Sequence, residues 1–458
     1  LSTVSTEGKR VWVYPKKPKG KLYNNRKVVS LILLIFFFVT PFIKYKGDPL
    51  LLLNIVERKF IIFGVIFWPQ DFHLVVLSII ALLVFVILFT VIFGRLFCGW
   101  VCPQTVFMEF VFRQVEYLIE GDINKQKKLA RQAWNFEKIW KKSLKHIVFF
   151  GIAFITANIF LSYLVSADQV MAMIKAGPGA HMTTFIALVF FSGAFYFIFA
   201  FFREQVCTIA CPYGRLQGVL LDDKSIVVAY DHKRGEPRGK HNPLEDRSVT
   251  DKGDCIDCKS CVMVCPTNID IRNGTQMECI NCTACIDACN SVMDRVKQPR
   301  GLIRYDSEKG VTTGQRSILN PRSLAYSAVL VILLIIVGTS FAFRTDFETT
   351  ILRQQGTLFQ EYGDDSYSNI YQIEVVNKTR IKHEVKVRLL EPAGELIMMG
   401  DPIITKEGDS GSGTFLAVLK RSILKSSNTR LVIGVYSNDE LIEKYEVSFI
   451  GPGSLDNK

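Results

Sequence analysis

Residues 255–266 read CIDCKSCVMVCP and residues 279–290 read CINCTACIDACN, so one cysteine pattern occurs twice in close succession. Each run spaces its cysteines as Cys-x-x-Cys-x-x-Cys-x-x-x-Cys. The chain holds 12 cysteines in 458 residues, and those outside the runs form two Cys-x-x-x-Cys-Pro motifs, here called the first and second CP motifs, Cys98–Pro103 and Cys207–Pro212. A chain of this length is too long for a small secreted fold held by disulfides, so we interpret the cysteines as metal ligands.

The spacing within the two runs indicates iron–sulfur binding. Bacterial two-cluster ferredoxins use this run, in which the first three thiolates bind one 4Fe–4S cubane and the fourth crosses to the other. Pro266 follows the first run, as in such ferredoxins, whereas Asn290 takes that place in the second run without changing the spacing of Cys289. Apolar residues at matched positions are expected to cover the clusters and lower the local dielectric. They are Ile256, Val262, Ile280 and Ile286.

Long apolar stretches indicate a membrane protein. Hydrophobic residues make up 49 % of the chain. Five stretches are long enough to span a hydrocarbon core of about 30 Å. They are Val28–Ile43, Phe72–Phe93, Ile147–Val165, Thr183–Phe202 and Ser323–Phe343. A sixth, Leu50–Trp68, contains the charged run Glu57-Arg58-Lys59 and is interpreted as an interfacial or re-entrant piece, because three charges at mid-depth are costly.

Basic residues predict how the spans are oriented. Eight lie between Lys9 and Lys27 and nine between Arg113 and Lys145, whereas only Lys175 lies between the third and fourth spans. The positive-inside rule then places the amino terminus, residues 103–146 and residues 203–322 in the cytoplasm, and the carboxyl end outside. Four basic residues fall on the outer side and count against this orientation, namely Lys44, Lys46, Arg58 and Lys59. Anionic lipid accounts for the net charge of +12 without any nucleic acid.

These features predict a multi-domain protein. Residues 1–27 form a cytoplasmic segment, 28–221 four transmembrane helices with both CP motifs, 222–320 a cytoplasmic dicluster ferredoxin domain, 321–345 the fifth transmembrane helix, and 346–458 an outer domain. Residues 232–247, rich in Lys, Arg, Gly and Pro, are expected to be a solvated linker. The last domain is predicted to be an antiparallel β-sandwich, with turns at 392–394 and 408–413, because five stretches have strand character. They are Tyr371–Val376, Glu384–Leu390, Gly413–Leu419, Arg430–Tyr436 and Glu443–Phe449.

The two CP motifs are predicted to meet at the cytoplasmic face, because each follows a span that runs inward. Their cysteines lie at i and i+4, on one face of a helix if the segment is helical. Identical motifs at one depth indicate halves of a single site, although two separate helix ends are the alternative. Soft sulfur ligands favour Cu(I), zinc or an iron–sulfur cluster, and the spacing does not choose among them. The candidate metal ligands are Cys98, Cys102, Cys207 and Cys211.

Several motifs resemble the cytochrome c oxidase accessory proteins CcoG, FixG and RdxA over nearly the whole chain. They are Gly94–Thr105, Glu120–Asp122, Cys211–Gln217, the dicluster runs, Pro299–Tyr305, Asn369–Tyr371 and Asn377–Thr379. The resemblance implies a bacterial inner-membrane protein with an immunoglobulin-like periplasmic end domain and two 4Fe–4S clusters. By this resemblance cluster 1 is held by Cys255, Cys258, Cys261 and Cys289, and cluster 2 by Cys279, Cys282, Cys285 and Cys265.

The resemblance also implies a function, namely reduction of Cu(II) to Cu(I) during assembly of a cbb-type haem–copper oxidase. The CP-motif thiols would then handle copper or hold a third cluster, and the partners would be copper ions and copper-delivery or oxidase-assembly proteins. The electron donor stays open, because the chain has no Gly-x-Gly-x-x-Gly fingerprint for a flavin or nicotinamide. Two alternatives are a membrane polyferredoxin that passes electrons from quinol or a soluble donor to an oxidoreductase, and a non-enzymatic redox-sensing scaffold.

Overall fold

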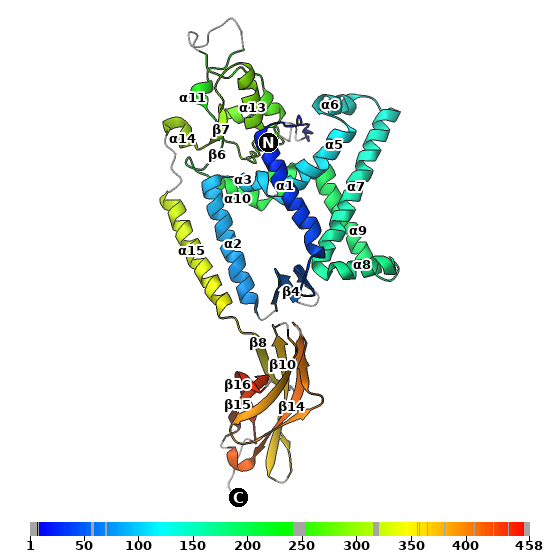
Figure 1. Cartoon of the computed structure of the whole chain (residues 1–458), viewed down its shortest axis with the longest axis vertical. Helices are drawn as coiled ribbons and strands as arrows, with labels where there is room; N and C mark the ends of the chain where they lie inside the picture. Colours follow the sequence, from blue (N-terminus) through cyan, green and yellow to red (C-terminus); the bar gives the residue numbers. More distant parts are fainter. Residues whose placement is uncertain are drawn as a thin grey trace. The chain divides into compact units, whose positions relative to one another are not determined.

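The computed structural model describes residues 7 and 9–452, apart from 56–58, 69–70, 241–251, 315–319, 355, 357, 364, 380, 407, 425 and 438. The chain divides into two compact units, Leu1–Val337 and Gly338–Lys458 (Figure 1). The first unit contains both CP motifs and both cysteine runs. The second is made of β-strands.

Five helices among the described residues are long and apolar enough to cross a membrane, which confirms the five predicted spans. They are α1 Lys21–Val39 with η1 Thr40–Phe42, α2 Phe72–Phe93, α7 Phe136–Val165, α9 Met182–Phe197 with η4 Ile198–Phe202, and α15 Pro321–Ala342. A helix of 22 residues such as α2 is about 33 Å long and so matches the hydrocarbon core. Helix α7 has 30 residues because its charged first turns extend it before the predicted span start at Ile147.

Shorter elements connect the spans. The helices are α3 Leu96–Trp100, α4 Pro103–Phe107, η3 Met108–Phe112, α5 Arg113–Ile119, α6 Ile123–Arg131, α8 Ala167–Ala176, η5 Val206–Ala210 and α10 Pro212–Leu220. An aromatic core forms where η3, α7 and η4 meet. The Phe112 ring stacks on Phe199 with 4.6 Å between centroids and meets the edge of Phe149 at 4.8 Å. This core fixes η3, which follows the first CP motif, and η4, which precedes the second.

The interrupted apolar stretch Leu50–Trp68 forms strands rather than a helix. Strands β3 Leu51–Asn54, β4 Lys59–Ile62 and β5 Val65–Phe67 make a three-stranded antiparallel sheet, which follows the hairpin β1 Lys44–Tyr45 and β2 Asp48–Pro49. Ile61, at the centre of β4, is fully buried. Glu57 and Arg58 lie outside the described residues. A small sheet therefore accounts for the apolar character of this stretch.

The cysteine runs lie between two paired strands, β6 Val227–Tyr230 and β7 Ile303–Asp306. The helices of this region are α11 His232–Gly235, α12 Ser260–Met263, η6 Ile271–Asn273, α13 Ala284–Arg295 and α14 Glu308–Thr313. The predicted linker 232–247 begins with the helical turn α11, where Arg234 forms an ion pair with Asp254, and residues 241–247 lie outside the described part. The main-chain N–H of Ile226, just before β6, donates to the carbonyl of Ile92 in α2 at 2.8 Å. The cluster region is therefore hydrogen-bonded to the membrane helices.

The second unit is an antiparallel β-sandwich, which confirms the predicted immunoglobulin-like end domain (Figure 1). One sheet has the order β12-β14-β10-β8 with β9 beside β10, and the other has the order β13-β11-β15-β16. The strands are β8 Phe347–Arg353, β9 Gln360–Glu361, β10 Ser366–Asn377, β11 His383–Glu391, β12 Glu395–Met399, β13 Ile403–Thr405, β14 Ser410–Lys420, β15 Asn428–Ser437 and β16 Glu440–Ile450. A 3-10 turn, η7 Arg421–Ile423, follows β14.

All five predicted strands lie within longer observed ones, but the predicted turn 408–413 is wrong in its second half. Residues 410–413 pair with β10, since small residues there lie against Ile403 of the opposite sheet.

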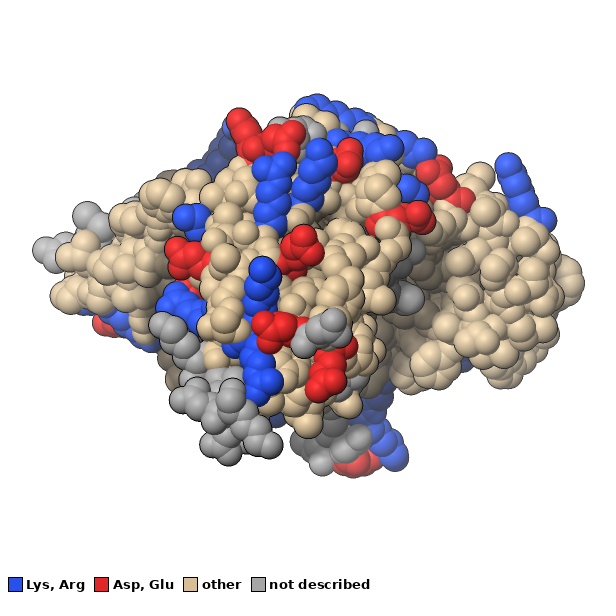
Figure 2. Space-filling model, turned by 90° about the horizontal axis from the view of Figure 1, so that it is seen from below, with Lys and Arg blue, Asp and Glu red and all other residues tan. Residues whose placement is uncertain are grey.

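Acidic and basic side chains are interspersed on the face that Figure 2 shows, and exposed pairs such as Arg388 with Asp439 cross the outer strands. Mixed charges of this kind keep such a surface soluble.

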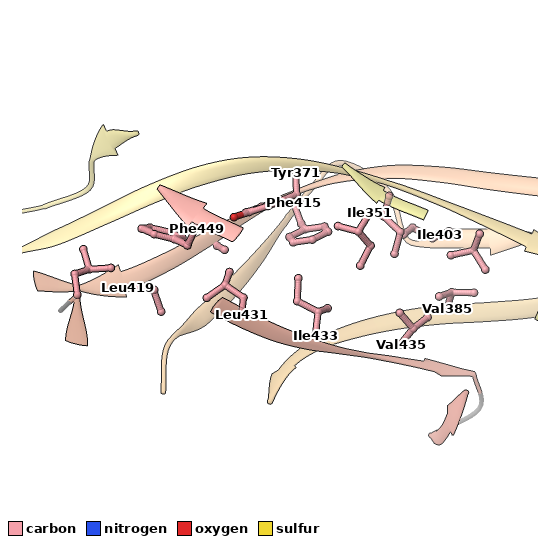
Figure 3. Packing of buried hydrophobic residues seen from close by; sticks show 14 residues of the cluster. Ile351, Tyr371, Val385, Ile403, Phe415, Leu419, Leu431, Ile433, Val435 and Phe449 are labelled. Atoms are coloured by element: carbon pink, nitrogen blue, oxygen red, sulfur yellow. The ribbon is translucent and has the colours of Figure 1, made fainter. Parts of the chain in front are cut away.

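Side chains alternate between the two faces of each strand, so that every second one points into the core of the sandwich (Figure 3). Tyr371 of β10 stacks on Phe415 of β14 with 5.4 Å between ring centroids, and neither is exposed. The Tyr371 hydroxyl donates to the carbonyl of Ser448 in β16 at 2.8 Å. This residue therefore joins the two sheets.

We expect Phe415→Ala to lower the free energy of opening of β10 and β14 by about 3–5 kcal/mol, because it leaves a cavity in the core. Tyr371→Phe should cost about 1 kcal/mol through the lost hydrogen bond. Amide hydrogen exchange of the full chain measures both values. The control is Leu352→Ala, whose side chain is exposed and whose exchange should stay unchanged. Equal protection in all three variants would contradict this core.

Candidate metal centres

The two cysteine runs have the same backbone conformation. Asp257 and Asn281, at matched positions, have φ of 49° and 52°, and Lys259 and Thr283 have φ of 57° and 64°. Positive φ is uncommon outside glycine, so its recurrence at equivalent places marks one loop structure used twice. Helices α12 and α13 then begin at matched residues. Each loop turns tightly around its own first three cysteines.

Each loop contributes to a cavity that the other loop completes. The first cluster cavity is lined by Cys255, Cys258, Cys261 and Cys289. The second cluster cavity is lined by Cys279, Cys282, Cys285, Cys265 and Cys261. Both are small, with about 340 Å³ of atom-free space that includes open solvent. The fourth cysteine of each run thus lies in the cavity of the other run, because α12 and α13 pack against each other.

The walls of both cavities are otherwise mostly apolar, although Lys259, Ser260 and Arg272 also line the first and Thr267 and Thr283 the second. The four matched apolar residues of the sequence lie around them, with Ile280 and Ile286 buried and Ile256 and Val262 partly buried. Asn290, which replaces proline in the second run, accepts a hydrogen bond from the Gly301 N–H at 3.0 Å. The second run therefore continues as helix α13, where the first run turns at Pro266.

Burial opposes thiolate formation in these cavities. It raises the pKa of Cys261, Cys279 and Cys289 to about 12 and that of Cys282 to about 11. A thiolate in such surroundings needs a nearby cation, and a bound metal supplies it. Four thiols around each apolar cavity fit a 4Fe–4S cluster. Cys258 is the exception to the burial, because its side chain is exposed.

The two CP motifs also share one backbone course. Gly94 and Arg203 each lie four residues before the first cysteine, with φ of 56° and 53°. Cys102 and Cys211 each have an extended backbone at the N-cap of the next helix, and the following proline takes its first position. Proline suits that position because its missing N–H would be unpaired there anyway. The segments are therefore bent at the second cysteine, rather than one continuous helix with thiols at i and i+4.

The structure brings the thiols of the two motifs together. Burial, together with the neighbouring thiols of Cys102 and Cys98, raises the pKa of Cys207 to about 12. The Cys98 thiol lies 3.4 Å from Gln217 Oε1 of α10, which follows the second motif. The Gln104 amide donates to the Arg203 carbonyl at 3.3 Å. Residues far apart in the sequence thus form one cluster of thiols.

No three His, Cys, Asp or Glu side chains in the described part of the chain are grouped tightly enough to hold a single metal ion. This applies to both cluster cavities as well as to the CP motifs. A cubane requires no such group, since each of its thiolates binds a different iron.

Sequence reasoning missed a buried ion-pair network beside the second motif. Both terminal nitrogens of Arg203 donate to Glu116 of α5, at 2.7 and 2.9 Å, and Lys145 of α7 lies 3.7 Å from the same carboxylate. All three side chains are buried. A non-glycine residue with positive φ costs free energy, and the bidentate pair holds Arg203 in place. The only clue in the sequence is that Arg203 lies four residues before Cys207, just as Gly94 lies four residues before Cys98.

The first CP motif packs directly on the second cysteine loop. A Cβ atom on Gly99 would lie 2.3 Å from the Ile280 carbonyl oxygen, so only glycine permits this approach. Cys98 lies in one hydrophobic cluster with Ile280, Cys282 and Ala284. The CP-motif thiols are therefore next to the cluster domain, as the sequence predicted, and the cavity that they adjoin is the second one, which the sequence did not specify.

Comparison with protein-family models finds matches in three parts of the chain. Residues 202–308 match a 4Fe-4S dicluster domain, residues 75–126 a 4Fe-4S binding domain, and residues 337–452 the IG-like fold at the C-terminal of FixG. The first two ranges contain all twelve cysteines. Iron–sulfur clusters are therefore the cofactors of this chain.

Curated relatives extend the match over most of the chain. It is 36 % identical to protein RdxA of Cereibacter sphaeroides over 386 residues, which cover 80 % of each chain. It is 35 % identical to RdxB of the same organism over 82 % of this chain and 81 % of the relative. Nitrogen fixation protein FixG of Rhizobium meliloti is 35 % identical over 65 % of this chain and 57 % of its own. At such identity over most of its length, the chain belongs to the RdxA and FixG family and is a membrane-bound iron–sulfur electron-transfer protein.

Proposed function

We propose that the protein reduces Cu(II) to Cu(I) in the bacterial inner membrane during assembly of a cbb-type haem–copper oxidase. The observation that carries this proposal is the contact of the CP-motif thiols with the second cluster cavity. Cu(II) takes one electron to become Cu(I), and iron–sulfur clusters supply single electrons. An external one-electron donor must reduce the clusters in turn. Copper-delivery or oxidase-assembly proteins would receive the product.

Two occupants of the CP-motif site fit the proposal. Thiolates are the soft ligands that Cu(I) prefers, which supports direct copper handling by Cys98, Cys102, Cys207 and Cys211. The match of residues 75–126 to a 4Fe-4S binding domain supports a third cluster, since it includes Cys98 and Cys102. With either occupant, Cu(II) would be reduced next to the second cluster cavity.

The crossed ligand assignment is supported by the cavities. Cys289 lies with the first three cysteines of the first run, and Cys265 with those of the second. One candidate span found among the described residues, Pro321–Ala342, separates the ferredoxin domain from the carboxyl-terminal domain, which supports their placement on opposite sides of the membrane. The basic residues support the cytoplasmic side for the ferredoxin domain. The exposed Cys258 suits a soluble donor on the cytoplasmic side.

The first expected outcome concerns the crossing. Cys265→Ala should damage the cluster bound by Cys279, Cys282 and Cys285 and leave the cluster of its own run in place, because its thiol lies in the second cluster cavity. Electron paramagnetic resonance of the reduced protein distinguishes the two signals. Loss of the Cys255 cluster alone would show that the assignment is wrong.

The second expected outcome concerns copper. Anaerobically purified protein, reduced with dithionite and freed of it, should convert Cu(II) to Cu(I), as a Cu(I)-specific chelator would measure. Cys98→Ala and Cys207→Ala should each abolish this, and the double variant should lose no more, because ligands of one site act as a unit. Iron analysis of the same samples separates the occupants, at about eight iron atoms without and about twelve with a third cluster.

Independent, additive losses in these variants would instead show two separate helix ends. Intact clusters that transfer no electrons to copper would favour the polyferredoxin that serves another oxidoreductase. A cellular role retained after loss of all eight dicluster cysteines would favour the scaffold.

The third expected outcome concerns topology. A reporter active only outside the inner membrane should be on when fused after Ser454 and off when fused after Asn242, two positions outside the described residues. An alkaline phosphatase assay in intact bacteria measures both. A carboxyl-terminal fusion that is inactive, with normal protein levels, would reverse the proposed orientation.

A further inference from the structure

Arg95, between α2 and α3, is a buried cation at the junction of the CP motifs and the second cluster cavity. Its Nε donates to Gln217 Oε1 at 2.6 Å, and its Nη1 donates to the carbonyl of Met277, two residues before Cys279. Only 3 % of the side chain is exposed. Both acceptors are uncharged, and no carboxylate among the described residues pairs with it. Its charge is therefore not offset by an ion pair.

The field of Arg95 reaches thiols on both sides of the junction. Burial raises the pKa of Cys279 and of Cys207, and Arg95 acts against that rise in both cases. A Cβ atom on Gly214, in the helix after the second CP motif, would lie 2.9 Å from an Arg95 terminal nitrogen. Arg95 is thus within electrostatic reach of the second cluster cavity and of the CP-motif thiols.

Arg26 of α1 adds a second buried cation on the same side. It is 1 % exposed, donates to the Gly99 carbonyl at 2.5 Å and lies over the Phe110 ring at 5.0 Å. Its charge acts on Cys282 of the second cavity. The carboxylate that acts on Cys282 against this charge is Glu109, which is itself ion-paired with Arg113. The buried carboxylate of Asp287 in α13 accepts from the main-chain N–H groups of Leu22 and Tyr23. Two buried guanidiniums thus stand against this one carboxylate, and the balance of these groups is positive.

The first cluster cavity has cations of its own, but carboxylates pair with its two arginines, and Lys259, which also lines it, is exposed to solvent that screens its charge. Arg272 lies 4.0 Å from the Cys255 sulfur and forms ion pairs of 2.7 Å with both Asp257 and Asp270. Arg234, which acts on Cys289, is paired with Asp254. Solvent also reaches this cavity at the exposed Cys258. The two cavities thus have similar sets of thiols but differ in the charge of the side chains around them.

Reduction adds a negative charge to a cluster, and an unpaired buried cation stabilises that charge strongly at low dielectric. Arginine keeps its proton in such surroundings. We infer that Arg95 and Arg26 make the cluster at Cys279, Cys282, Cys285 and Cys265 the more easily reduced of the two, so that electrons entering at the exposed Cys258 move toward the CP-motif thiols. The inference rests on the proposed function in one respect only, that electrons leave at those thiols. Arg95 and Arg26 are positioning residues that set a potential.

The test is a redox titration of the full-length protein in detergent, followed by electron paramagnetic resonance. The second-cavity signal is identified as the one that Cys282→Ala removes. It should have the higher midpoint potential in the unchanged protein. Arg95→Gln keeps a hydrogen-bond donor but removes the charge. It should lower the midpoint potential of the second-cavity cluster by about 59 mV, which for a one-electron couple changes the partition of electrons between the clusters about tenfold. Arg95→Lys should largely restore it.

Arg300→Gln is the matched control, because this exposed guanidinium is paired with Asp294 and lines neither cavity. Both potentials should be unchanged in that variant. If Arg95→Gln loses iron, Arg26→Gln provides the same measurement, because Arg26 also acts on a ligand of the second cavity. A lower potential at the second cavity in the unchanged protein, or no shift in either charge variant, would overturn the inference. Since the readout is a potential and not copper reduction, failure of the proposed function is seen separately.

Discussion

A close backbone contact joins Gly99 of the first CP motif to Ile280 of the second cysteine loop, and the rest of the electron path depends on it. Because Gly99 has no side chain, the first CP motif reaches the carbonyl that lies between two cluster ligands. Arg26 then binds the Gly99 carbonyl from α1, and the Tyr305 hydroxyl of β7 binds the Asn281 carbonyl at 3.1 Å. A bulkier residue at position 99 would separate these groups.

Buried charge is distributed unevenly through this assembly. The region around the second CP motif uses paired charges, in which Glu116 neutralises Arg203, whereas the junction with the second cluster cavity uses guanidiniums hydrogen-bonded to neutral oxygens. An ion pair fixes geometry with little net field outside it. An unpaired guanidinium fixes geometry and also leaves a field, which matters where a group gains an electron. The same residue type therefore serves two purposes within one bundle.

Repetition is the means by which the chain builds its sites. The ferredoxin loops repeat both their cysteines and their left-handed residues, and the CP motifs repeat a positive-φ residue, a cysteine N-cap and a proline. In each pair the copies face each other, so that a complete site takes ligands from both. The crossed position of Cys265 and Cys289 is one result, and the approach of Cys102 to Cys207 is another.

The sequence by itself determined the spans, the β-sandwich and the cysteine groups, because these depend on local composition and spacing. Apolar stretches of about 20 residues form membrane helices wherever they occur. Strand alternation likewise identified β10, β11, β14, β15 and β16, although it missed short strands such as β9 and β13 and misplaced a turn before β14. The sequence pattern did not predict the strands within Leu50–Trp68, because a short apolar run has no distinctive period.

Only the tertiary structure decided which cysteine pair lies beside which cavity, where the CP motifs bend, and which arginines are neutralised. These features depend on contacts between residues far apart in the chain. Arg95 and Arg272 are both arginines near cysteines in the sequence, yet one lies against an amide and a carbonyl and the other between two aspartates. Charge compensation is a property of neighbours in space, and the linear spacing of residues does not contain it.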